Sequence, residues 1–102
     1  MTYPHQPDHM TLVITHGVQR DKLADYECWL ETLKTDAARF PGYQNVNILR
    51  PVHGETTYTL LVRFDNIDNL YQWIHSDQRE IREAALANLL RGQEYIEMRT
   101  QA

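Results

Sequence analysis

The chain has 102 residues, of which 42% are hydrophobic and 24% charged, and its formal net charge is −4 at pH 7. This length accommodates one domain with one hydrophobic core, and the composition excludes a disordered or low-complexity protein. The acidic balance and the scattered Lys and Arg residues argue against a nucleic-acid partner, because phosphate binding needs clustered basic side chains.

Targeting and redox signals point to a cytoplasmic protein. The N-terminal residues lack the pattern of a signal peptide, so we expect none, and no apolar run approaches the ~18 residues of a membrane span. Cys28 is the only cysteine, which excludes an intramolecular disulfide and agrees with a reducing compartment. We expect Cys28 to be a buried or half-buried structural thiol in a helix rather than a nucleophile.

Residues 1–9 form a polar, proline-containing segment that predicts a flexible tail. His5, Asp8 and His9 within it could be drawn as a metal site. No rigid element would hold these side chains together, so we expect no metal there.

The first strand is predicted at residues 10–18, where His16 shares one face with aliphatic residues of the same strand. The longest helix is predicted at residues 20–39, from apolar residues at intervals of three and four. Phe40-Pro41-Gly42 ends this helix, because Pro cannot continue it and Gly supplies an unusual backbone angle.

Two further strands are predicted at residues 43–50 and 57–64, joined by a hairpin-sized loop. Strict alternation in the first of them places Tyr43, Asn45 and Asn47 on a common face. Paired asparagines on a strand could orient a ligand carbonyl or make hydrogen bonds at an interface.

Two short helical pieces are predicted next. Asp65 or Asn66 can cap the first, which carries Trp73, and Ser76-Asp77 can begin the second. The charged run from Asp77 to Glu83 predicts a solvated face. The core-facing stripe of the second piece is expected to be Ile81, Ala84, Ala85 and Leu89.

A last strand is predicted at residues 94–98, which completes the order β-α-β-β-α-β. This is the split motif of ferredoxin-like α+β folds, with a four-stranded antiparallel sheet and the helices on one face. We therefore expect one domain at residues 10–98 and a short C-terminal tail at residues 99–102.

The face of the sheet without helices also carries apolar residues, among them Val13 and Leu61. A monomer rarely leaves a large apolar patch in water, so this face predicts a homodimer that pairs through its sheets. Arg63 is expected on the same side, in a structural ion pair with Glu97.

Three local features together carry a family resemblance. They are Phe40-Pro41-Gly42-Tyr43 after the first helix, Trp73 in the helix after the third strand, and the Ser76-Asp77 restart. Over roughly residues 10–98 the chain resembles the antibiotic biosynthesis monooxygenase superfamily. The resemblance implies a ferredoxin-like domain that pairs into a dimeric α/β barrel.

Two enzymatic branches of that superfamily suggest residues to compare. The Asn, Trp and haem-ligating His of haem-degrading members fall on His16, Trp73 and Glu83, so only the Trp is kept and haem is not expected. The Asn, Trp and Tyr of the cofactor-free oxygenases fall on three apolar residues, Leu60, Phe64 and Leu70. Hydrogen-bond donors that would stabilise a substrate anion are therefore missing at those positions.

The resemblance and the remaining polar groups predict a monooxygenase-like protein that acts on or binds a small aromatic or quinol-type molecule, without metal or haem. The molecule would lie between the sheet and the helices, against Trp73, with His16 as base or proton shuttle. The residues expected to contact it are Asn45, Asn47, Tyr58 and Tyr71. The alternative is a non-catalytic dimeric module that binds a ligand or partner, such as the soluble head of a larger family architecture.

Overall fold

The computed structural model describes residues 9–101 of the chain. Its elements are β1 (His9–Gly17), η1 (Arg20–Lys22), α1 (Leu23–Ala37), β2 (Tyr43–Leu49), β3 (Thr57–Phe64), α2 (Ile67–Ile74), α3 (Asp77–Leu86) and β4 (Tyr95–Gln101). The expected tail at residues 1–9 lies outside the described residues, except for His9, which begins β1. The last strand runs to Gln101, past the predicted boundary at residue 98.

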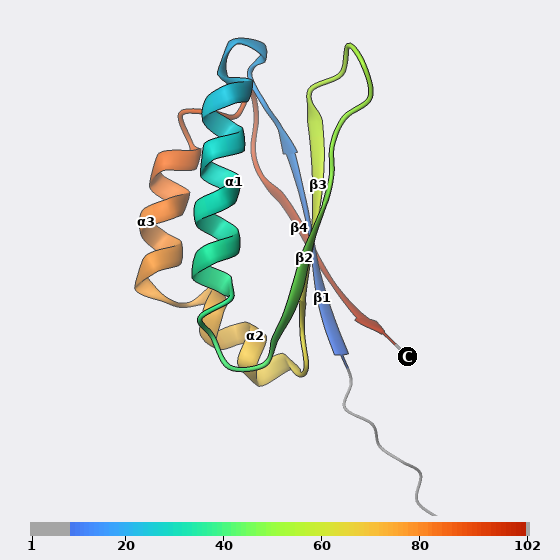
Figure 1. Cartoon of the computed structure of the whole chain (residues 1–102), viewed down its shortest axis with the longest axis vertical. Coiled ribbons are helices and arrows are strands. Elements are labelled where there is room, and N and C mark those ends of the chain that lie inside the picture. Colours follow the sequence, from blue (N-terminus) through green and yellow to red (C-terminus); the bar gives the residue numbers. More distant parts are fainter. Residues whose placement is uncertain (1–8, 102) are drawn as a thin grey trace, which may run out of the picture.

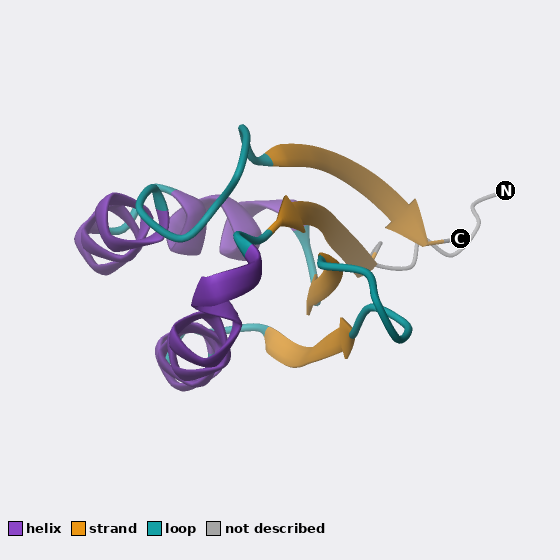
Figure 2. Ribbon diagram, turned by 90° about the horizontal axis from the view of Figure 1, so that it is seen from above, coloured by secondary structure: helices purple, strands orange, loops and turns teal. Residues whose placement is uncertain are grey.

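The four strands form one antiparallel sheet in the order β2-β3-β1-β4. The helices cover one face of this sheet and leave the other open (Figures 1 and 2). The ferredoxin-like α+β fold predicted from the sequence is therefore confirmed.

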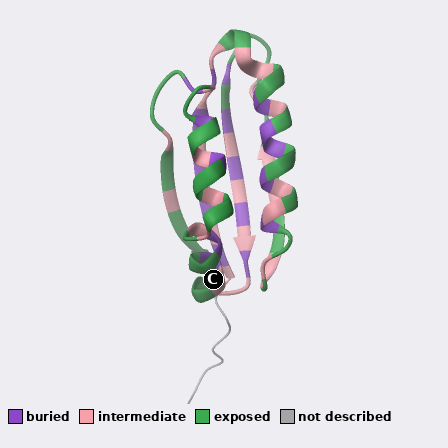
Figure 3. Ribbon diagram, turned by 90° about the vertical axis from the view of Figure 1, so that its left-hand side faces the viewer, coloured by how far each residue is buried: buried purple, intermediate pink, exposed green. Residues whose placement is uncertain are grey.

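The core lies between the sheet and the helices (Figure 3). Alternate residues of β1 and β3 point into it, which is why both strands alternate between buried and half-buried positions. The apolar stripe of α1 packs against them, as predicted. Its buried members are Tyr26, Trp29, Leu30, Leu33 and Ala37.

Two of the helix caps predicted from the sequence are present in the structure. The Asn66 side chain accepts a hydrogen bond from the Asn69 amide at the start of α2, and Ser76 accepts one from the Arg79 amide at the start of α3. Between α1 and β2, Gly42 has φ of +83°, a conformation that an L side chain rarely adopts. The predicted Phe-Pro-Gly stop thus forms the turn that returns the chain to the sheet.

The prediction that Tyr43 shares a face of the sheet with Asn45 and Asn47 is wrong. Tyr43 pairs with Phe64 and Asn45 pairs with Arg63, so the register shifts at Gln44. This bulge turns Tyr43 to the helix side, where its ring lies 6.1 Å from that of Phe64, while Asn45 stays on the open side.

The prediction of which face of α3 packs against the core is also wrong. Ile81 is 71% exposed, whereas the buried residues of the helix are Arg82 and Leu86. The aliphatic spacing predicted another side, but the side that the structure buries carries Arg82, whose guanidinium pairs with Asp36 of α1. The charged run that begins at Asp77 is consequently not a uniformly solvated face.

Two smaller expectations are also corrected. Cys28 is exposed on α1, so it is not a buried or half-buried thiol. Glu97 pairs with Arg99, its neighbour two residues along β4, and not with Arg63. In an edge strand, side chains two residues apart lie on the same face and reach each other readily.

Candidate functional site

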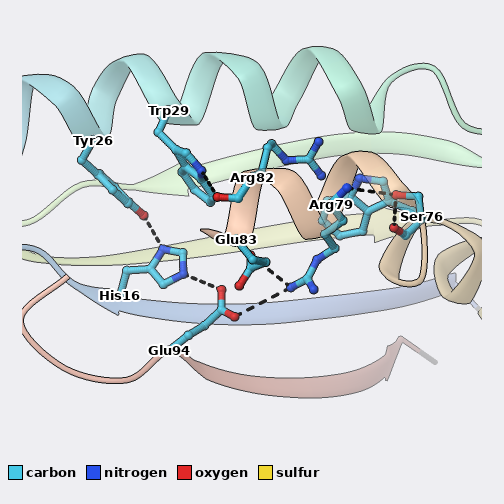
Figure 4. A network of polar contacts seen from close by, with 9 residues as sticks. His16, Tyr26, Trp29, Ser76, Arg79, Arg82, Glu83 and Glu94 are labelled. Carbon is cyan, nitrogen blue, oxygen red and sulfur yellow. Dashed lines mark hydrogen bonds and ion pairs between the residues drawn. The ribbon is translucent and has the colours of Figure 1, made fainter. Parts of the chain in front are cut away.

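A chain of polar contacts runs through the core beneath α3, and His16 lies at its inner end (Figure 4). His16 is fully buried on β1. Its Nδ1 lies 2.6 Å from the Tyr26 hydroxyl oxygen, and its Nε2 lies 2.6 Å from a carboxylate oxygen of Glu94. Because an ionised carboxylate only accepts, Nε2–H donates to Glu94, and in the neutral imidazole Nδ1 then accepts the hydroxyl proton of Tyr26.

The outer end of the chain joins two carboxylates and an arginine. Arg79 Nη2 lies 3.8 Å from Glu94 and 3.6 Å from Glu83, so its guanidinium lies between the two carboxyl groups. The side chains of Glu94 and Glu83 are 16% and 29% exposed, whereas that of His16 is 0% exposed. The contacts thus lead from the closed core towards solvent.

The environment drives the pKa values of these two carboxyls apart. The pKa of Glu83 is raised to about 7, first by burial and then by its hydrogen bond with Glu94 and the negative charge of that residue. Burial also acts upward on Glu94, but hydrogen bonds with His16 and Glu83 and the charge of Arg79 outweigh it, so the pKa of Glu94 lies below its usual range. Such a pair can hold one proton near neutral pH and pass it on.

Unpaired donors surround Trp73 in the same layer. The Trp73 indole is fully buried, with the guanidinium carbons of Arg79 and Arg82 lying 5.4 Å and 5.8 Å from its ring centroid. Trp73 Nε1 and the Nε and Nη2 atoms of Arg82 are buried without a hydrogen-bond partner among the described residues. Buried donors are almost always paired in proteins, so these three atoms suit an acceptor such as a ligand oxygen or an ordered water.

The residues predicted for the site are spread over three places. His16 and Trp73 share the layer between sheet and helices, joined through Glu94 and Arg79. Tyr58 is the register partner of His16, but its hydroxyl donates to Glu27 at 2.7 Å.

Asn45, Asn47 and Tyr71 lie elsewhere. The two asparagines line a hollow on the open face of the sheet, on the opposite side from His16. Tyr71 is 42% exposed on α2, beside His75. The predicted ligand contacts therefore do not converge on one site.

The space expected for a ligand is filled at four positions. Leu60, Phe64, Leu70 and Trp73 are all 0% exposed, and the rings of Phe64 and Trp73 stack 6.0 Å apart. A molecule that contacts Trp73 has to displace part of this packing. Among the three α-helices, α3 buries the fewest apolar side chains, since only Leu86 among its apolar residues is buried.

Sequence reasoning missed Glu94, Arg79 and Arg82. Glu94 lies just before β4, where nothing in the local pattern marks it, and the two arginines belong to a run that resembled a solvated face. Glu83 stands out in the sequence only because it falls where haem-degrading relatives carry their iron ligand. Within residues 9–101, no group of three or more His, Cys, Asp or Glu side chains is arranged to hold a metal ion.

Comparison with solved structures places this fold among known ones. A candidate antibiotic biosynthesis monooxygenase from Caulobacter crescentus CB15 is 24% identical, with a TM-score of 0.85 over 95% of this chain and 92% of that one. The cofactor-independent oxygenase SnoaB from Streptomyces nogalater is 19% identical, with a TM-score of 0.77 over 93% of this chain and 92% of that one. A candidate antibiotic biosynthesis monooxygenase from Nitrosomonas europaea is 12% identical, with a TM-score of 0.84 over 98% and 95%.

At these identities the likeness establishes the fold. No protein-family model matches the chain, and no curated protein matches it in sequence. In the part of the chain that the structure describes, no helix is both long and apolar enough to cross a membrane. The chain has the fold of the antibiotic biosynthesis monooxygenase superfamily, as its resemblance to that superfamily implies.

Proposed function

We propose that this chain, with the fold of the antibiotic biosynthesis monooxygenases, is a monooxygenase-like protein that binds a small aromatic or quinol-type molecule without metal or haem. The observation that carries the proposal is the Glu83–Glu94 carboxyl pair, backed by His16 in a closed core. A group whose pKa lies near the working pH is suited to general acid–base catalysis.

The chemical step that these residues support is removal of a proton from a phenolic or quinol hydroxyl. The proton passes to the carboxyl pair, and the electron pair of the broken O–H bond stays on the ligand as a phenolate. His16 holds Glu94 in place through the hydrogen bond from its Nε2. In this role His16 is a positioning residue and Glu83 is the residue that exchanges the proton.

The phenolate needs hydrogen-bond donors in a site shielded from water. The unpaired donors of Trp73 and Arg82 can supply them, in place of the polar side chains that the cofactor-free oxygenases carry where this chain has Leu60, Phe64 and Leu70. Entry of the ligand requires a shift of α3. This helix is the mobile element in the proposal because a buried arginine, rather than a set of apolar residues, holds it to the core.

A turnover assay tests this proposal. Oxygen consumption with a panel of quinols and polycyclic phenols would identify a substrate, and the variants Glu83→Gln and Trp73→Phe would then be compared with Arg39→Gln, which changes an exposed residue. We expect kcat to fall by about 10²-fold or more for Glu83→Gln, with little change for Arg39→Gln. Equal rates for all three variants, or for His16→Ala and the native protein, would refute the assignment.

A second candidate is a non-catalytic dimeric module that pairs through the open faces of its sheets. The complete burial of Leu60, Phe64, Leu70 and Trp73 favours it, because a filled interior suits a scaffold better than an enzyme. Two results together would favour this candidate. The native protein would sediment as a dimer in analytical ultracentrifugation, and it would turn over no substrate in the panel.

A further inference from the structure

Tyr26 is a buried phenol that the proposed function does not use. Its side chain is fully buried on α1, and its hydroxyl oxygen lies 2.6 Å from Nδ1 of His16 (Figure 4). Burial raises the pKa of Tyr26 well above its usual range, so the phenol does not ionise by itself in the core. Loss of one electron changes this, because an oxidised phenol is a strong acid. Oxidation of Tyr26 would therefore move its proton along the existing hydrogen bond.

His16 is arranged to receive that proton. In the neutral imidazole Nδ1 carries no proton, because Nε2–H donates to Glu94. A proton added to Nδ1 makes an imidazolium, and the carboxylate oxygen of Glu94, 2.6 Å from Nε2, balances its positive charge. The three side chains thus place a phenol, a base and a counter-charge in a row. This arrangement allows Tyr26 to be oxidised without leaving an unpaired charge in the core.

A second phenol leads from Tyr26 towards the surface. The ring centroids of Tyr26 and Tyr58 lie 4.5 Å apart, so the two π systems are in contact. The Tyr58 hydroxyl donates to a carboxylate oxygen of Glu27 at 2.7 Å, and the Glu27 side chain is 37% exposed. An electron can therefore leave the core through Tyr58, which also has a proton acceptor beside its hydroxyl.

The bases beside the two phenols favour Tyr26 as the residue that keeps the radical. A carboxylate generally binds a proton more weakly than an imidazole does. The hydrogen bonds from Arg50 hold the pKa of Glu27 below its usual range, which makes that carboxylate a still weaker base. Because proton loss accompanies electron loss, the phenol beside the stronger base is the easier one to oxidise.

We propose that Tyr26 is a redox-active tyrosine, which gives one electron through Tyr58 to a one-electron oxidant at the surface, of the organic peroxyl radical class, and its phenolic proton to Nδ1 of His16. The O–H bond of Tyr26 breaks and an N–H bond forms on His16. The products are a neutral tyrosyl radical, an imidazolium and a peroxide anion. One electron from an external reductant and return of the proton restore the phenol. No step involves the ligand site, so this proposal does not rest on the proposed function.

Flash oxidation of the full-length protein by photogenerated tris(bipyridine)ruthenium(III) tests the proposal, with electron paramagnetic resonance as the readout. We expect a long-lived tyrosyl radical in the native protein, because a buried radical cannot couple with that of another molecule. Tyr26→Phe should lose this signal, and Tyr58→Phe should form it more slowly. Tyr71→Phe removes an exposed phenol and should leave the signal unchanged. Circular dichroism and thermal unfolding establish that each variant folds.

Histidine labelled with a heavy nitrogen isotope identifies the radical without any variant. Among the described residues, Tyr26 has the only tyrosine hydroxyl that is hydrogen-bonded to a histidine. The proposal therefore expects magnetic coupling between the radical and the imidazole nitrogen of His16. A native protein without a long-lived radical, a radical without this coupling, or a folded Tyr26→Phe variant that keeps the signal would each overturn the proposal. An unchanged rate of formation in Tyr58→Phe would overturn the route through Tyr58.

Discussion

The Nε2 atom of His16 lies 2.6 Å from a carboxylate oxygen of Glu94, although the two residues are 78 positions apart in the sequence. This contact ties the first strand to the segment that precedes the last one. It also fixes the imidazole so that its other nitrogen receives the Tyr26 hydroxyl. The stability of the core and the proton chemistry of the site therefore depend on the same three side chains.

The Tyr26 hydroxyl is the first feature to test, because Tyr58 provides a matched control. Tyr26→Phe leaves the fully buried Nδ1 of His16 without its partner, so we expect a loss of about 1–3 kcal/mol in the free energy of unfolding. Tyr58→Phe removes the same group from a half-buried contact with Glu27, which retains its two hydrogen bonds with Arg50. Its cost should be about 0.5–1.5 kcal/mol, and urea unfolding measures both. Equal losses in the two variants would show that the hydrogen bond with His16 stabilises the protein no more than the one with Glu27.

Glu83 should give the protein a distinctive pH dependence of stability. Its pKa is raised from 4.5 to about 7 in the folded protein, so the folded state binds more protons than the unfolded state between these two pH values. The free energy of unfolding contributed by this group therefore falls as pH rises from about 4.5 to about 7. Glu94, whose pKa is lowered, acts in the opposite direction and at lower pH, below about 4.5.

Urea titrations at several pH values measure this effect. In Glu83→Gln the decline between about pH 4.5 and pH 7 should disappear, whereas Glu80→Gln, which changes an exposed residue of the same helix, should keep it. A decline of the same slope in Glu83→Gln and the native protein would assign the proton to another group.

Because Arg82 of α3 pairs with Asp36 of α1, we expect the stability of the protein to depend strongly on the Asp36 carboxylate. Asp36→Asn leaves a largely buried guanidinium without its counter-charge, so we expect a loss of about 3–5 kcal/mol in the free energy of unfolding. Glu31→Gln removes one partner of the exposed Lys34–Glu31 pair on the same helix and should cost about 0–0.5 kcal/mol. Calorimetry or denaturant unfolding distinguishes the two, and a small effect of Asp36→Asn would mean that water already solvates Arg82.

Substitution of two glycines with positive φ distinguishes the cost of backbone strain from the cost of a steric clash. Gly54 has φ of +88° with nothing within 4 Å of an added Cβ, so Gly54→Ala should cost only the conformational term, about 1–2 kcal/mol. Gly42 has φ of +83°, and an added Cβ would clash with Asp65 Oδ1, so Gly42→Ala should cost measurably more in the same unfolding assay. Identical costs would indicate that the Asp65 side chain moves away freely.

Much of the fold could be predicted from the sequence because its signals are local. The apolar stripe of α1, the alternation in β3, the Phe-Pro-Gly stop and the Asn66 and Ser76 caps each depend on residues a few positions apart. The bulge at Gln44 could not be predicted in this way, since an extra residue in a strand shows only against its partner strand. Its consequence was the misplacement of Tyr43.

The polar chemistry of the candidate site was largely beyond sequence reasoning. His16 could be proposed because a polar residue interrupts an apolar strand face, and Trp73 because it falls where members of the family carry a Trp. Glu94 and Arg82 could not, because charged residues before a strand or on a short helix are usually solvated, and only the tertiary fold shows what faces them. The orientation of α3 illustrates this, since its buried side carries Arg82, which pairs with distant Asp36, while Ile81 is exposed.

The way α3 is anchored also bears on how the native protein fluctuates. A helix that buries one arginine and one leucine contributes little apolar contact, so its local opening should require far less free energy than global unfolding. Its amide hydrogens are then expected to exchange with solvent as one early group, well before those of β1 and β3. Each such opening would briefly expose the indole of Trp73 to water, while the sheet beneath it stays intact.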